Sequence, residues 1–145
     1  MLPPSLFSLN VILCERVLTE TDAVLSAIRI VDVYYVMRAK EGETGGSAIP
    51  LWIIVTARVP LGLSEEHFVQ LQLTRPSGET LLLGDKRPVK GESNFKEAHA
   101  GFAFVANILL TPKELGIHYL SLLYDDAEVS KIPFTLLERD SDSTK

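Results

Sequence analysis

Acidic side chains in turn-forming stretches are the first candidates for chemistry in this sequence of 145 residues. Loop carboxylates at one end of a β-rich domain can hold calcium, which takes about six to eight oxygen ligands. Paired aspartates are also frequent in tight turns, where they hydrogen-bond to nearby backbone. Because the spacing is loose, we favour the turn interpretation and predict no metal site, with calcium as the alternative. The carboxylates concerned are Asp125, Asp126 and Glu128 in one turn, and Glu20, Asp22, Asp85 and Glu92 in other loops.

Nucleophiles and general bases show no catalytic spacing. No serine lies in the Gly-x-Ser-x-Gly pattern that exposes a nucleophile on a sharp turn. His67 and His118 fall within predicted strands, where a packed or half-exposed histidine is expected, and His99 in a predicted loop is the best acid–base candidate. No histidine has a paired acid at a suggestive spacing, so we predict no enzyme, no catalytic residue and no cofactor. The serines considered are Ser26, Ser64, Ser93 and Ser121.

Two further motifs favour structure over chemistry. The single cysteine, Cys14, ends the apolar run Leu9–Cys14 and is expected to be a small buried hydrophobe. One cysteine and scattered histidines offer no zinc-ligand spacing. Gly42–Ser47 is rich in glycine but lacks the lysine of a phosphate-binding loop, and its acidic side chain repels phosphate. We expect that segment to be a flexible loop.

Glu15 and Arg16 interrupt a strand that is otherwise apolar. In one interpretation they form ion pairs with the next strand, Glu15 with Arg29 or Arg16 with Asp32. In the other they mark the edge of a sheet, where charges prevent aggregation. A structural role of either kind is favoured over contact with a ligand.

The bulk composition narrows the classes of function. Of the residues, 46% are hydrophobic and 23% are charged, with a formal net charge of −5, which suits one soluble domain and excludes a disordered chain. An acidic domain is a poor binder of nucleic-acid phosphates, and the one basic cluster, at residues 85–90, also holds an acidic side chain. No stretch resembles a transmembrane helix or a signal peptide. A cytoplasmic protein without nucleic-acid or membrane partners is expected.

The candidate residues are expected to lie on β-strands separated by turns. Alternation is clearest where Val69, Leu71 and Leu73 share one face, and residues 75–78 then form a hairpin turn. In the second strand the alternation shifts near Ile30, which predicts either a bulge or two covered faces. The expected loops are 38–49 and 84–100, and the expected strands are 6–18, 23–37, 51–59, 66–74, 79–83, 101–111, 117–124 and 128–137.

About eight strands and no convincing helix predict an all-β fold, a two-sheet antiparallel β-sandwich. Residues 1–137 form its single domain and 138–145 a polar flexible tail. A closed barrel is the alternative, disfavoured because the strands are uneven in length and the second strand can bend between sheets. The strand 51–59 is apolar on both faces and is expected to be central, with Trp52 as a core anchor.

Short motifs spread over most of the chain can be taken together: Leu13–Val17, Val24–Asp32, Pro50–Val55, Leu71–Gly78 and Gly116–Phe134. They resemble a family of uncharacterised small bacterial proteins. The resemblance implies an immunoglobulin-like β-sandwich and a bacterial source, but it carries no catalytic residue. The step from Gly116 to Tyr119 is also similar to the end of many immunoglobulin-like sandwiches, where a tyrosine hydroxyl ties a corner to the backbone.

Elimination and a surplus of apolar strand surface together favour a protein-binding function. We expect a non-enzymatic β-sandwich that binds another protein, or a second copy of itself as a homodimer. The contact is expected on a sheet face or at the loops 38–49 and 84–100. The alternative function is a small-ligand or calcium-binding domain that uses the acidic loops.

Overall fold

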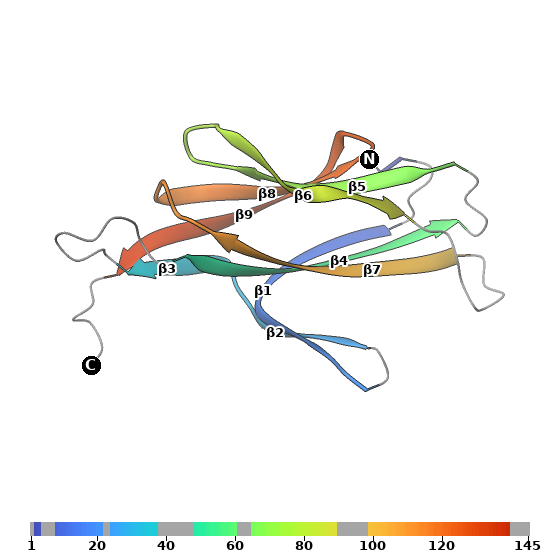
Figure 1. Ribbon diagram of the computed structural model, residues 1–145, viewed down its shortest axis with the longest axis horizontal. Helices are drawn as coiled ribbons and strands as arrows, with labels where there is room; N and C mark the ends of the chain where they lie inside the picture. The colour runs from blue at the N-terminus through green and yellow to red at the C-terminus, as the bar shows by residue number, and fades with distance from the viewer. Residues whose placement is uncertain are drawn as a thin grey trace.

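The computed structural model describes residues 2–3, 8–21, 24–37, 48–60, 65–89 and 99–139. These residues form two facing β-sheets and no helix, which confirms the predicted all-β class (Figure 1). Consequently, no helix among them could cross a membrane. Sheet A has the strand order β2-β1-β4-β7, and sheet B the order β3-β9-β8-β5-β6. The strands are β1 (Ser8–Thr19), β2 (Leu25–Ile30), β3 (Val33–Met37), β4 (Ile49–Pro60), β5 (His67–Thr74), β6 (Thr80–Val89), β7 (His99–Leu110), β8 (Gly116–Tyr124) and β9 (Ala127–Arg139).

The core lies between the two sheets, because alternate residues of strands in both sheets point into it. β4 contributes the buried residues Leu51, Ile53 and Val55, and β8 contributes Leu120 and Leu122. β4 lies between β1 and β7, which confirms its predicted central position. Burying one such aliphatic side chain typically contributes about 1.5–3 kcal/mol. This shared core therefore holds the two sheets together.

The prediction that Trp52 anchors the core is wrong. Residues alternate across β4, so Leu51 and Ile53 point inward and Trp52 points to the other face, where it is half-buried. On that face Ile54 and Cys14 are buried as well, with exposed fractions of 4% and 0%. The second apolar face of β4 is therefore partly covered within the chain, which removes part of the surplus apolar surface expected from the sequence.

The long strand predicted at 23–37 is two strands that belong to different sheets. β2 pairs with β1 in sheet A, and β3 pairs with β9 in sheet B. Between them, Val31 N–H donates to Leu13 O (3.1 Å) and Thr135 N–H donates to Asp32 O (2.8 Å). The shift in alternation is thus a crossing between sheets, and the described residues form nine strands where about eight were expected. β3 runs parallel to β9, so the predicted all-antiparallel pairing is wrong for these two strands.

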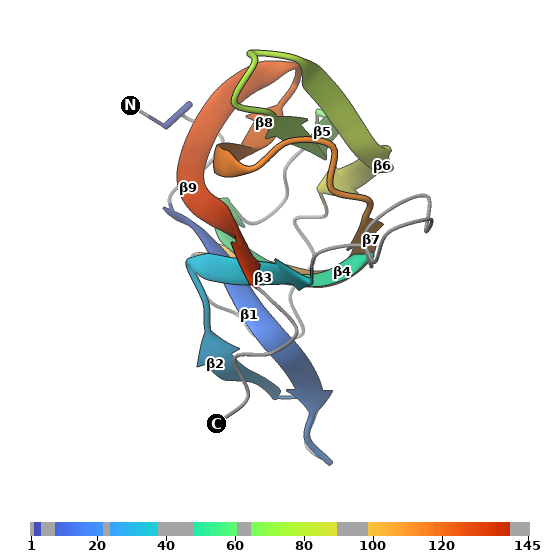
Figure 2. The ribbon, with the colours of Figure 1, turned by 90° about the vertical axis from the view of Figure 1, so that its left-hand side faces the viewer.

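β1 takes part in two different pairings along its length. Residues 8–14 pair with β4, and residues 14–19 pair with β2. The second half of β1 and β2 form a hairpin that projects from the two-layer body (Figures 1 and 2). On this hairpin Glu15 and Arg29 form an ion pair with 3.4 Å between Oε1 and Nη1, which confirms one of the two expected pairs. Among the described residues, no ion pair joins Arg16 to Asp32.

Both hairpins of sheet B agree with the prediction, but the strand ends differ. β5 and β6 are joined by the expected turn, as are β8 and β9. β6 continues to Val89 and β7 begins at His99, so both ends of the predicted loop 84–100 are strand. β9 continues to Arg139, past the expected start of the tail. Residues 38–47, 90–98 and 140–145 of the expected loops and tail lie outside the described residues.

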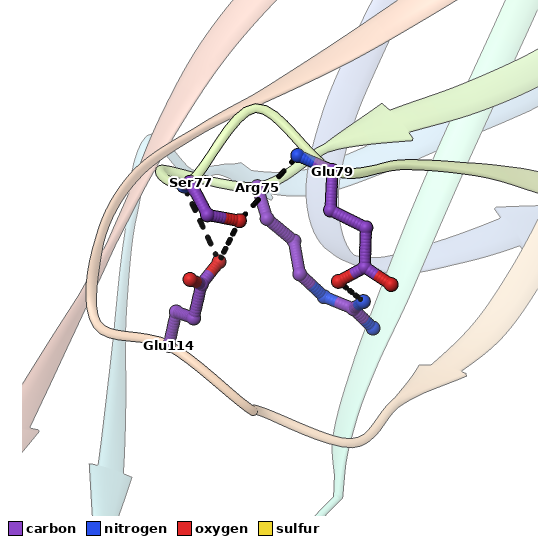
Figure 3. Close-up of polar contacts among 4 residues, drawn as sticks. All are labelled: Arg75, Ser77, Glu79 and Glu114. Carbon is purple, nitrogen blue, oxygen red and sulfur yellow. Dashed lines mark hydrogen bonds and ion pairs between the residues drawn. The ribbon is translucent and has the colours of Figure 1, made fainter.

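A polar network ties the β5–β6 turn to the segment before β8 (Figure 3). Arg75 is buried, and its guanidinium pairs with the Glu79 carboxylate in the same turn. The Ser77 hydroxyl donates to Glu114 Oε2 at 3.0 Å. The hydrogen bond from Arg75, together with its charge, holds the pKa of Glu79 below its ordinary value. The network fixes the geometry of this end of sheet B.

Candidate functional site between strands β6 and β7

A hollow lies between the end strands of the two sheets. β6 ends sheet B and β7 ends sheet A, on the same side of the molecule (Figures 1 and 2). The hollow has a volume of about 210 Å³ and is lined by residues 69–71 of β5, 83–85 and 87 of β6, and 104–108 of β7. Pockets for drug-sized ligands are typically about 300–1,000 Å³. This hollow is therefore sized for one or two side chains.

β7 has no strand on its outer side among the described residues. It extends over 12 residues, none of which is Asp, Glu, Lys or Arg. Ala106 and Leu110 are buried, whereas Leu109 is 71% exposed. An edge strand presents backbone N–H and C=O groups to another strand, and natural edges usually carry charges or prolines that prevent this pairing. The outer side of β7 is therefore a long template for strand addition without those protective residues.

β6, on the other side of the hollow, is a protected edge. Its register with β5 shifts between Val69 and Leu71, which produces a bulge near Gly84. Gly84 has a φ of 73°, a left-handed conformation that glycine adopts without steric cost. Its carbonyl oxygen accepts a hydrogen bond from Gln70 Nε2 at 2.9 Å. Because bulges disrupt edge pairing, β6 borders the hollow without offering an edge itself.

Opposite charges from β6 lie beside the hollow. Asp85 and Arg87 are exposed and line it. The Arg87 guanidinium stands over the Phe104 ring of β7, with Cζ 4.6 Å from the ring centroid. Lys86 is neutralised by Asp126, with 2.6 Å between Nζ and Oδ1. In the described part of the chain, Asp85 and Arg87 form no such ion pair and remain the charges available to a partner.

A second polar cluster lies at the start of β5. His67 Nδ1 and Asp125 Oδ2 are 2.5 Å apart, and Asp125 Oδ1 accepts the Phe68 N–H at 2.9 Å. The His67 ring stacks on Tyr124 with 5.2 Å between centroids, and its Nε2 lies 3.9 Å from Glu65 Oε2. Burial raises the pKa of Asp125, but the hydrogen bonds from His67 and the Phe68 amide outweigh it and hold that pKa below its ordinary value. The fold thus gives His67 an acid partner 58 positions away, which the spacing of residues in the sequence did not indicate.

The His67–Asp125 pair orients an imidazole, as a general base requires, but catalysis also needs a reacting group at the other ring nitrogen. In the described residues, Nε2 faces Glu65, with 3.9 Å between Nε2 and Oε2. The contact that the structure does show has a structural role, because it ties the start of β5 to the β8–β9 turn.

Among the described residues, the carboxylates considered as calcium ligands do not gather in one cluster. Those described in the β8–β9 turn each have a protein partner, and in the described part of the chain no group of three acidic, histidine or cysteine side chains could hold a metal ion. The calcium alternative gains no support from this arrangement. The remaining partners are Lys86 for Asp126, Ser121 for Glu128 at 2.8 Å and Ser26 for Glu20 at 2.9 Å, whereas Asp22 and Glu92 lie outside the described residues.

The other candidate bases and nucleophiles that the structure describes lie on β2, β7 and β8. His118 is 1% exposed and stacks on Phe134 with 5.3 Å between centroids, which confirms the packed interpretation. His99 is the first residue of β7 and not part of a loop, because that strand begins earlier than expected. Ser64 and Ser93 lie outside the described residues.

Cys14 is a buried hydrophobe, as predicted. Its Sγ lies 3.7 Å from the Trp52 carbonyl oxygen, and burial raises the pKa of the thiol. Because the thiolate is the nucleophilic form, this environment disfavours reactivity. Next to it, the Glu15 and Arg29 side chains are 44% and 76% exposed, so their ion pair contributes little to stability.

The β6–β7 site was missed by sequence reasoning because the loop predicted at 84–100 concealed part of both strands. The signal that could have found it is the contrast between the charged residues 85–87 and the charge-free run 99–110. Comparison of the chain with protein-family models, with curated proteins and with solved structures gave no match. The geometry of the β6–β7 site is therefore what points to a function.

Proposed function

We propose that the protein is a non-enzymatic interaction module that binds an extended polypeptide strand along the outer side of β7. The observation that carries the proposal is the charge-free, 12-residue edge of β7 beside a hollow of about 210 Å³. A strand added to a sheet edge gains backbone hydrogen bonds, and its alternate side chains enter flanking pockets. The inward side chains of a bound strand would enter the hollow between β6 and β7.

The other end strands are poorer docking edges. β6 carries a bulge and the charged residues 85–87. β3 has only 5 residues. In β2, Arg29 has a φ of 52°, a left-handed conformation that interrupts a regular edge. Among the described edges, β7 alone combines length, regular pairing and absence of charge.

The strand order supports an immunoglobulin-like form of the sandwich. Constant-type immunoglobulin domains have strands A, B, E and D in one sheet and C, F and G in the other. If β1, β4 and β7 correspond to A, B and E, then β5, β8 and β9 correspond to C, F and G, and the neighbours agree in both sheets. Strand D of such domains lies beside E, which is the side of β7 proposed as the docking edge. The resemblance to small bacterial proteins of this fold is consistent with that correspondence and remains part of the proposal.

Hydrogen exchange of the full chain, with and without a synthetic strand, tests the proposal. The probe is an acetylated and amidated peptide of alternating Thr and Val, about ten residues long, which can span most of β7. At submicromolar protein and excess peptide, we expect the backbone amides of β7 to gain protection and those of β2 and β3 to be unchanged.

Charged substitutions on β7 provide the matched control. The double variant Ala103→Lys, Asn107→Lys places lysines at two exposed positions of the edge strand and should remove the protection. Asn10→Lys adds one lysine at an exposed position of β1, which is not an end strand, and should leave the protection intact. Absence of protection in the wild-type chain, or full protection in the double variant, contradicts the proposal.

A further inference from the structure

We infer that the strand accepted by β7 is β7 of a second copy of this chain, related by a two-fold axis. This inference rests on the proposed function and names its partner. In a two-fold contact, residue i of one copy meets residue j of the other, and residue j of the first meets residue i of the second. An edge strand can therefore pair in antiparallel fashion with the same strand of a second copy. The two four-stranded sheets A would join into one continuous sheet across the axis.

The charged residues beside β7 can form opposite-charge contacts with the same residues of a second copy. A second copy carries the same net charge of −5, so the contact is favoured only where like charges do not meet. β7 brings no charge to the contact, and Lys86 is already neutralised by Asp126. Asp85 and Arg87 line the hollow beside residues 104–108, close to the middle of β7. An axis there brings Asp85 of each copy towards Arg87 of the other.

Leu109 supplies an apolar reason for the same contact. It is 71% exposed on the edge strand, and among the large hydrophobic side chains that the structure describes only Ile30, at 74%, is more exposed. With the axis at Ala106, antiparallel pairing sets Leu109 of one copy opposite Ala103 of the other. The pairing therefore places each of the two Leu109 side chains beside the small, exposed Ala103 of the other copy.

A charge swap in the full chain tests the inference by sedimentation equilibrium. Wild-type protein is expected to dimerise in the micromolar range. Asp85→Arg and Arg87→Asp each set like charges against one another across the axis, so each variant alone should dimerise about tenfold more weakly or worse. An equal mixture of the two variants restores both opposite-charge contacts, so it should form a heterodimer with close to wild-type affinity.

Edge variants separate this inference from the proposed function. Ala103→Lys, Asn107→Lys should abolish the dimer, and Asn10→Lys should leave it unchanged. A dimer that survives the double variant, or a mixture that shows no rescue, overturns the inference. A chain that stays monomeric while the Thr-Val peptide still protects β7 overturns the inference and leaves the proposed function standing. A monomer that also fails to bind the peptide overturns both.

Discussion

The guanidinium of Arg87 stands over the ring of Phe104, with 4.6 Å between Cζ and the ring centroid. The two residues come from different sheets, because β6 ends sheet B and β7 ends sheet A. On the opposite side of the molecule the chain itself crosses between the sheets, where Thr135 N–H donates to Asp32 O. One side of the molecule is thus joined through the backbone and the other through a side-chain contact, and no described strand pairs with the outer side of β7.

The Arg87–Phe104 contact should contribute measurably to stability. Arg87→Ala removes an exposed cation–π contact, so the free energy of unfolding should fall by about 0.5–1 kcal/mol. Arg87→Lys should recover only part of the loss, because an ammonium cannot stack on the ring as a planar guanidinium does. Urea denaturation at submicromolar protein measures both, since a low concentration excludes any dimer effect. Equal stability of all three proteins would show that the contact contributes nothing.

The His67–Asp125 pair should make part of the stability sensitive to acid. The pKa of Asp125 is lowered in the folded state, so its contribution is present above the unfolded value of about 4 and is lost as pH falls through the folded value. Glu79 acts in the same direction, so acid sensitivity should not vanish when Asp125 is neutralised.

Asp125→Asn isolates the contribution of the Asp125 charge to stability. Asparagine tolerates the φ of 49° at this position, so the variant removes the charge without straining the backbone. The variant should lose about 1 kcal/mol near neutral pH, a value discounted for the partial exposure of the carboxylate. The difference from wild type should shrink by about pH 3. Urea midpoints at both pH values check this, and a difference that is independent of pH would assign the loss to the turn backbone.

Tyr34 should make the stability of the fold sensitive to alkaline pH, in contrast to the acid sensitivity from Asp125. Burial, followed by the charges of Cys14 and Glu15, raises the pKa of Tyr34 to about 12, against about 10 in an unfolded chain. Because the folded value is the higher one, stability is full below about pH 10 and falls as pH rises towards 12, in total by about 2–3 kcal/mol. Tyr34→Phe should remove this decline, and Tyr35→Phe, at an exposed neighbour, should not.

At neutral pH the same variant tests the hydroxyl itself. No described residue hydrogen-bonds to the buried Tyr34 hydroxyl, so Tyr34→Phe should leave stability unchanged or raise it by up to about 1 kcal/mol. Thermal or urea unfolding near pH 7 measures the change. A loss of more than about 1 kcal/mol would mean that the hydroxyl is satisfied in the folded protein.

The strands could be predicted from the sequence because alternation is a local signal. Val69, Leu71 and Leu73 are all buried, as their spacing indicates. The prediction for Trp52 was wrong for a related reason. A strand that is apolar on both faces shows no alternation of apolar and polar residues, so the position of the covering sheet decides which face belongs to the core. The crossing after β2 was visible as a shift in alternation, but a bulge shifts it equally, and only the position of β9 distinguishes them.

Contacts between residues distant in sequence followed a different rule. The Glu15–Arg29 pair could be predicted because one hairpin joins the two residues. His67 and Asp125 are 58 positions apart, and their contact depends on the order of β5 and β8 in sheet B, which no local pattern contains. The hollow between β6 and β7 depends likewise on which strands end the two sheets.

Cys14 should report on opening of the projecting hairpin, because it lies where β1 leaves β4 and pairs with Ile30 of β2. Its side chain is 0% exposed, and burial raises the pKa of its thiol. Because the thiolate is the reactive form, the native protein should react with a disulfide reagent about 100-fold more slowly than the urea-unfolded chain, or more slowly still. Glu15→Gln should change this rate less than about threefold, since its ion pair is exposed. A native rate close to the unfolded one would show that β2 separates readily from β1, and would contradict the pairing at Cys14.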